Sequence, residues 1–275
     1  MKRLITILFS VVSLLVYFSS CNSDDKAREV LRNANQLARE GEFEQALKQY
    51  DIAIELDEKM PEAYLGKSFV YLQSGDLNTA LAEVNKAIML DENFYKAYFN
   101  RALILNEMGK KNEAIADYSQ AIHIKPDHWN AILNRADLKG DLGDVKGEIE
   151  DYNKLISSQP KYAEAYYNRA YAKDELKDYE GAIQDYTMAI SFNKSYTEAY
   201  FNRAYTFDNM GLYEKAIEDL NKVIELDSLF SDAYLNRALA LIEIGMKKEA
   251  YKDLNRAGEL GNKEAFTLIN LHFNQ

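Results

Sequence analysis

The chain has 275 residues and a formal net charge of −11, with only three prolines and twelve glycines. So few helix-breaking residues argue against a disordered chain and against an all-β fold. The acidic charge argues against nucleic acid as a partner, because that binding depends on cations that neutralise phosphates, and it favours neutral or basic partners.

The first 20 residues have the pattern of a secretory signal peptide. Lys2 and Arg3 precede a 15-residue apolar run, residues 4–18, which only one threonine and two serines interrupt. Such a run is short for a membrane-spanning helix, and small residues follow it, as they do at a cleavage site. We therefore expect residues 1–20 to be removed; an uncleaved membrane anchor is the alternative interpretation.

Cys21 is the only cysteine, so it cannot form an intramolecular disulfide. Its position after Ser19 and Ser20 resembles the lipobox of bacterial lipoproteins, in the looser form of Bacteroidota because Phe18 replaces the usual aliphatic residue. The resemblance implies that Cys21 is lipidated, that residues 21–26 form a tether, and that the protein is an outer-membrane lipoprotein of the cell envelope. The acidic residues of the tether resemble a surface-export signal, and a solvated spacer is the alternative, so the side of the membrane stays open.

A 34-residue period governs the rest of the chain. A six-residue phrase containing Asn-Arg begins at residues 97, 131, 165, 199 and 233, and a looser copy begins at residue 63. Glycine recurs with the same period, and Lys177 alone occupies a glycine slot. The period divides residues 27–262 into seven units, which are 27–60, 61–94, 95–128, 129–162, 163–196, 197–230 and 231–262.

Each unit has the apolar spacing of two amphipathic helices. In residues 95–128, one apolar stripe ends at Gly109 and a second follows it, with Ala102 and Ala114 small enough for the helices to approach closely. Pro126 and Pro160 fall between units, where they break no helix. These features resemble the tetratricopeptide-repeat (TPR) family, which implies an all-α, right-handed α-solenoid of seven helix-turn-helix units with a concave groove.

The C-terminal end of this pattern and its middle differ from the rest. Residues 263–275 carry an apolar stripe that predicts a capping helix, since the last unit of a solenoid exposes an apolar face. Unit four, residues 129–162, has Glu148 where Ala114 and Ala182 stand in neighbouring units, and it contains Gly140 and Gly147. A glycine inside a helix costs ~1 kcal/mol relative to alanine, so we predict that unit four is the least stable.

An aspartate follows each arginine of the repeated phrase by sixteen residues. The pairs are Arg101 with Asp117, Arg135 with Asp151, Arg169 with Asp185, Arg203 with Asp219, and Arg237 with Asp253. We interpret them as structural ion pairs between the two helices of a unit. The alternative is that the arginines bind an acidic partner.

The first helices of TPR units line the family's groove, which predicts the binding residues. The asparagines are Asn100, Asn134, Asn168, Asn202 and Asn236; the aromatic residues are Phe99, Tyr167, Tyr171, Phe201 and Tyr205; the acids are Asp174 and Asp208, with Glu107, Asp137, Asp141 and Glu175 nearby. The asparagine column resembles the ladder of O-GlcNAc transferases, which implies recognition of a peptide main chain. Alternatively, asparagine is simply common in this slot and the aromatic rings only fill space between helices.

The sequence shows no arrangement of catalytic or metal-binding residues. His123, His128 and His272 match no metal-ligand spacing, so we expect no metal, no cofactor and no enzymatic activity. We expect a protein-interaction scaffold that holds a peptide segment or protein partner in its groove. A structural subunit that uses its convex face or its ends is the alternative, and an adaptor for glycan or cell-wall machinery is a third interpretation.

Overall fold

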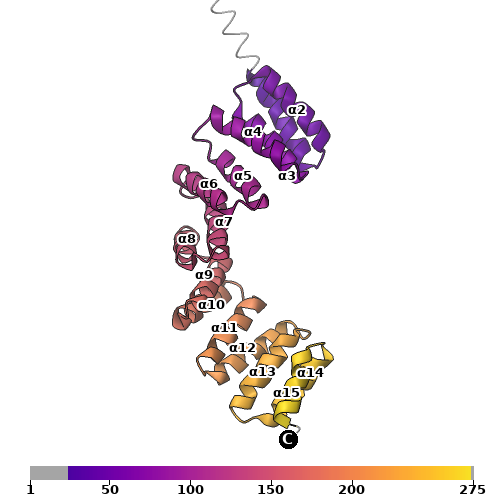
Figure 1. Ribbon diagram of the computed structural model, residues 1–275, viewed down its shortest axis with the longest axis vertical. Helices are drawn as coiled ribbons and strands as arrows, with labels where there is room; N and C mark the ends of the chain where they lie inside the picture. Colours follow the sequence, from indigo (N-terminus) through magenta and orange to yellow (C-terminus); the bar gives the residue numbers. More distant parts are fainter. Residues whose placement is uncertain (1–23, 274–275) are drawn as a thin grey trace, which may run out of the picture. The chain divides into compact units, whose positions relative to one another are not determined.

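A computed structural model describes residues 24–273, and this part of the chain contains helices and turns but no strand (Figure 1). The signal peptide, Cys21 and the start of the tether lie outside the described residues. Residues 24–39 are helical, so the first helix already includes residues 24–26, which we had assigned to the tether. None of the helices within residues 24–273 is both long and apolar enough to cross a membrane.

The later helices alternate in length between 13 and 14 residues up to α13. They are α2 (Phe43–Leu56), α3 (Pro61–Gln73), α4 (Leu77–Leu90), α5 (Tyr95–Glu107), α6 (Lys111–Ile124), α7 (Trp129–Asp141), α8 (Val145–Ser158), α9 (Ala163–Glu175), α10 (Tyr179–Phe192), α11 (Thr197–Asn209), α12 (Tyr213–Leu226), α13 (Ser231–Glu243), α14 (Lys247–Glu259) and α15 (Lys263–Phe273). The chain divides into two compact units with the boundary between Ala131 and Ile132, inside α7.

Small residues hold the helices of each repeat together. Within the two units, α3 packs on α4, α5 on α6, α9 on α10, α11 on α12 and α13 on α14. The second helix of a repeat also contacts the first helix of the next one, as α4 contacts α5 and α10 contacts α11. Ala80, Ala87 and Ala97 are fully buried in one such core. Alanine at a helix contact lets two backbones approach, so each repeat covers the apolar face of the next; the fold is an α-solenoid of helix-turn-helix units.

The turn inside each repeat requires a left-handed residue. Glycine supplies it at residues 41, 75, 109, 143, 211 and 245, with φ between +71° and +82°. Lys177 takes the same conformation with φ of +61°, although its side chain disfavours it. The periodic glycines therefore end the first helix of each repeat, and the one missing glycine leaves the backbone path unchanged.

Helix α8 begins with a capped end at Gly147. The Asp144 side chain accepts a hydrogen bond from the Gly147 amide at 3.1 Å. A Cβ atom on Gly147 would lie 2.2 Å from the Asp144 carboxylate. The cap contributes ~1 kcal/mol. Thr79 donates the same bond to Asp76 at the start of α4, so the cap does not require a glycine at this position.

Helix α15 covers the apolar end of the last repeat. Ala265 is fully buried, and Leu268, Ile269 and Phe273 pack on the cluster formed by α13 and α14. Phe266 belongs to the same predicted stripe but is 54% exposed. The capping helix predicted from the sequence is therefore present, and the Phe266 ring lies against Gly258 of α14 while about half of the residue stays exposed.

Candidate functional site

All five arginine–aspartate pairs form, each with two parallel hydrogen bonds. Arg101 Nε donates to Asp117 Oδ2 at 2.6 Å, and its Nη2 donates to Asp117 Oδ1 at 2.8 Å. The other pairs have the same geometry, with distances of 2.6–2.8 Å. This fork-to-fork contact joins the two helices of a repeat.

The third nitrogen of four of these arginines reaches the preceding repeat. The acceptors are Asn85 for Arg101, Asn153 for Arg169, Thr187 for Arg203 and Asn221 for Arg237. Each guanidinium therefore connects three helices, and a tyrosine one turn earlier lies over it at 5.5–5.7 Å. This geometry makes the arginines structural, and it leaves them little capacity to bind an acidic partner.

The aspartates of these pairs differ in whether a second cation lies beside them. Burial works against ionisation of Asp151, but hydrogen bonds from Arg135 and Lys139 hold its pKa below the ordinary value. Burial raises the pKa of Asp219, which Arg203 only partly opposes. Lys139 Nζ lies 2.8 Å from Asp151, whereas Arg203 makes the only ion pair that the described residues offer to Asp219.

The predicted asparagine column does not form a row of free amides. Asn100 is buried and donates to Ser68 Oγ at 2.9 Å. Asn202 donates to the Tyr167 hydroxyl at 2.9 Å. Asn134 also has a bonded partner. Asn168 and Asn236 are half-buried and line two different pockets.

The predicted aromatic residues divide into packed and exposed rings. Phe99 lies against His128 with 4.9 Å between ring centres, and Phe201 lies against Phe230 at 5.0 Å. Tyr171 and Tyr205, in contrast, are 52% and 56% exposed. Phe99 and Phe201 are half-buried, so they fill space between helices as well as presenting an edge to solvent, whereas Tyr171 and Tyr205 offer most of their surface to a partner.

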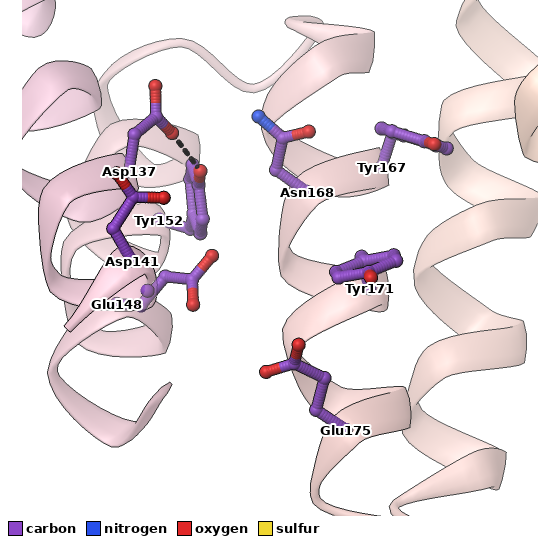
Figure 2. Close-up of a pocket in the computed structure, with 9 residues that line it drawn as sticks. Asp137, Asp141, Glu148, Tyr152, Tyr167, Asn168, Tyr171 and Glu175 are labelled. Atoms are coloured by element: carbon purple, nitrogen blue, oxygen red, sulfur yellow. Dashed lines mark hydrogen bonds between the residues drawn. The ribbon is translucent and has the colours of Figure 1, made fainter. Parts of the chain in front are cut away.

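One pocket of the second unit gathers acidic and aromatic side chains from α7, α8 and α9. Its lining is Asp137, Gly140, Asp141, Glu148, Tyr152, Tyr167, Asn168, Tyr171 and Glu175, around a volume of about 540 Å³. Figure 2 shows the carboxylates of Glu148 and Glu175 pointing toward each other across the space between α8 and α9. The Tyr152 hydroxyl donates a hydrogen bond to Asp137 at one edge of the pocket.

Glu148 is the most buried carboxylate of this pocket, with 8% of the residue exposed. Burial raises its pKa to about 7, and the neighbouring charge of Glu175 adds to the increase. Asp137 and Asp141 act in the same direction. Four carboxylates with no base among them give the pocket a strongly negative potential.

Two predicted acids lie elsewhere. Asp174 accepts a hydrogen bond from Thr206 Oγ1 at 2.6 Å. Asp208 lines a smaller pocket with Tyr205 and Asn236. Within the second unit, the predicted groove residues thus line two pockets, the acidic one and the smaller one. Among residues 24–273, no group of three or more His, Cys, Asp or Glu side chains could hold a metal ion.

Family models for the tetratricopeptide repeat match more than half of the chain. They match residues 95–128, 163–196 and 197–228, and two related models match residues 34–75 and 61–94. The chain belongs to the TPR family. Residues 129–162, which contain Gly140 and Glu148, lie outside these matches.

Solved TPR structures share this fold. The MamA protein is 28% identical, with a TM-score of 0.59 over 62% of this chain and 93% of that chain. A TPR protein from Parabacteroides merdae is 21% identical, with a TM-score of 0.58 over 89% and 97% of the two chains. The C-terminal part of a TPR protein from Cytophaga hutchinsonii is 16% identical, with a TM-score of 0.75 over 86% and 98%. No curated protein sequence matches the chain.

Sequence reasoning missed the role of Glu148 and Gly140, although one signal was available. The repeat position of Glu148 is alanine in the other six TPR units, at residues 46, 80, 114, 182, 216 and 250. In the sequence this departure supports only the prediction that unit four is the least stable. The structure places both residues in the lining of the acidic pocket.

Proposed function

We propose that this TPR protein, a protein-interaction scaffold by its repeats, binds an extended segment of a protein partner in the pocket of α7, α8 and α9, without catalysing a reaction. The observation that carries the proposal is the exposed Tyr171 ring beside the half-buried Asn168 amide in a pocket lined by four acids. A tyrosine contributes a large contact area at low entropic cost, and a carboxamide can pair with a peptide C=O and N–H.

Photo-cross-linking tests which surface meets the partner. Benzoylphenylalanine replaces Tyr171 in one full-length variant and Leu271 in another, and each variant is irradiated in its native envelope. Leu271 of α15 is a matched control because it is 56% exposed and lies outside the pocket. We expect cross-links at position 171 to one short segment of a partner, mapped by mass spectrometry. Cross-links that are confined to position 271 would reject the pocket.

A structural subunit that binds through its ends is the second candidate. The specific observation is that α15 exposes Phe266 and Leu271, two large apolar side chains on the terminal helix. Replacing Leu271 by serine would then abolish partner capture, while Tyr171→Ala would leave capture unchanged. The opposite pattern supports the pocket.

We also propose that the protein is exported and lipid-anchored through Cys21. The supporting features are the basic start, the apolar run of residues 4–18 and the following Ser19-Ser20-Cys21. Palmitate labelling of the intact protein should disappear in Cys21→Ser, and that variant should leave the membrane fraction. Equal labelling of both proteins would contradict lipidation at Cys21.

A further inference from the structure

Gly140 and Glu148 form a matched pair. A Cβ atom on Gly140 would lie 2.6 Å from Glu148 Oε2 and 2.9 Å from Glu148 Cδ, so the missing side chain of α7 leaves the space that this carboxylate occupies. In the preceding repeat the same two positions are Asn106 and Ala114. In unit four the larger side chain thus stands on the second helix instead of the first, so the Glu148 carboxylate lines the pocket.

The Glu148 carboxylate has no bonding partner within residues 24–273. The residue is more than nine-tenths buried, and its side chain accepts no hydrogen bond and forms no ion pair there. The nearby bases are used elsewhere: Lys139 Nζ lies 2.8 Å from Asp151, and Lys173 Nζ lies 2.7 Å from Asp185. Its oxygens are reached only from the pocket, where they are poorly hydrated, so this carboxylate gains by meeting a cation there.

The surroundings of Glu148 suit an organic cation. Its neighbours are the carboxylates of Asp141 and Glu175, and the exposed Tyr171 ring lies between Asn168 and Glu175 along α9 (Figure 2). An ammonium or guanidinium group on an apolar stem can contact an aromatic face and several carboxylates together. The described residues offer no group of His, Cys, Asp or Glu close enough to ligate a metal ion, so these acids do not converge on one point.

We propose that this pocket takes the lysine or arginine side chain of a peptide, with Glu148 as the deepest contact and Asp137, Asp141 and Glu175 around it. The inference rests on the proposed binding of a peptide here, and it specifies that the bound segment carries a basic residue at this point. The net charge of −11 favours the approach of such a segment.

Three peptides of one design test the chemistry. They are acetyl-Gly-Ser-Lys-Ser-Gly-amide and the versions with arginine or norleucine at the centre, titrated against the full chain in detergent micelles by microscale thermophoresis. We expect dissociation constants on the order of 1–10 mM for the two basic peptides, as single-residue anchors provide. The norleucine peptide keeps the stem without the charge and should bind at least roughly tenfold more weakly.

Variants assign the binding to Glu148. Glu148→Ala restores the alanine of the other six repeats, and the double variant Gly140→Asn, Glu148→Ala restores the pair of residues 106 and 114. Both should weaken lysine-peptide binding roughly tenfold and retain the helical circular dichroism of the parent. Glu214→Ala removes the same charge from the exposed start of α12 and should leave binding unchanged.

Two outcomes would overturn the inference. The first is equal binding of the lysine and norleucine peptides; the second is equal loss of binding in Glu148→Ala and Glu214→Ala, which would mean attraction by net charge alone. Either result, together with a cross-link from position 171 to a segment without a basic residue, leaves the peptide-binding function intact. If position 171 gives no cross-link to any segment of a partner, the proposed peptide-binding function itself is rejected.

Discussion

The pocket of the first unit and the acidic pocket of the second have nearly equal volumes, about 550 and 540 Å³, and different chemistry. Phe69, Phe94 and Phe99 line the first pocket, whose basic residues are Arg39 and Lys96. The second pocket has three tyrosines and four acids. A few side chains therefore set the class of partner that each pocket can accept. They also set its size, because the equivalent positions two repeats later, around Tyr205 and Asp208, enclose only about 80 Å³.

One repeat position illustrates this variation. Phe69 and Leu103 occupy it in the first pocket, and Asp137 and Tyr171 occupy it in the second. The backbone at this position is a first helix in every case. A 34-residue repeat can thus vary its groove at constant fold, because these side chains lie outside the alanine contacts that hold the helices together.

Replacing Arg203 should cause the largest loss of stability, because the ion pairs join the helices of the repeats on which both pockets are built. Arg203→Ala leaves buried Asp219 without its cation and should cost about 3 kcal/mol of unfolding free energy. Arg169→Ala should cost only about 1–2 kcal/mol, since Lys173 stays 2.7 Å from Asp185. Urea denaturation followed by circular dichroism measures both.

The matching double variants check the interpretation. Adding Asp219→Ala to Arg203→Ala should cost little more, because it removes the carboxylate that was left unpaired. Strictly additive losses would mean that the two residues stabilise the repeat independently and that the pairing contributes nothing.

The next effect is a pH dependence that belongs to the acidic pocket. The pKa of Glu148 is about 7 in the fold against an ordinary value of 4.5, so folding takes up a proton between these pH values. Stability is therefore highest below pH 4.5 with respect to this group, falls as pH rises to 7, and stays reduced above it. Glu148→Gln should be about 2 kcal/mol more stable than the parent at pH 8 and equal to it at pH 4.

Thermal melts of parent and variant at pH 4, 6 and 8 measure this difference. The groups that face Glu148 are Asp137 and Asp141 from α7 and Glu175 from α9, all acids, so none of them reverses the sign. Glu214→Gln is the control on an exposed surface. A constant difference between Glu148→Gln and the parent at all three pH values would show that Glu148 does not titrate in this range.

Each pocket is lined by one glycine, Gly66 in the first and Gly140 in the second, and replacing it by alanine should change the stability by a smaller amount. A Cβ atom on Gly66 would lie 2.3 Å from the buried Tyr50 ring, whose hydroxyl is held by a 2.7 Å hydrogen bond to Asn35. Gly66→Ala should therefore cost about 1–2 kcal/mol. Gly140→Ala meets only the flexible end of Glu148 and gains helix propensity, so we expect a change under about 1 kcal/mol. Equal losses in the two variants, measured by urea denaturation, would contradict this distinction.

The sequence predicts what depends on spacing and misses what depends on distance between helices. The 34-residue period predicted the helix pairs and the partners Arg101 and Asp117, because a repeated offset reports a repeated contact. The apolar stripe of residues 263–275 predicted the capping helix. The period could not show that Asn100 bonds to Ser68, since that contact crosses repeats and uses a serine found at only this position of the phrase. It also concealed that Gly140 and Glu148 compensate each other.

The packing around α7 and α8 likewise could not be predicted from the sequence. Two glycines and a glutamate inside one repeat predicted low stability from helix propensity alone. The structure shows a cap at Gly147 and a pocket wall at Gly140. Whether unit four is the least stable repeat stays a prediction, which hydrogen exchange of α7 and α8 can measure.

The smallest expected effect concerns the turn that ends α9 in the second unit. Lys177 has a φ of +61°, whereas the turns of the first unit use glycines such as Gly75 and Gly109. A side chain in this conformation costs ~1 kcal/mol. Glycine recovers only part of that free energy, because it also makes the unfolded chain more flexible. Lys177→Gly should therefore stabilise the protein by about 0.5 kcal/mol, whereas the reverse change Gly143→Lys should destabilise it by about 1 kcal/mol. If both variants melt at the parent's temperature, the left-handed turns contribute nothing to the difference between the two units.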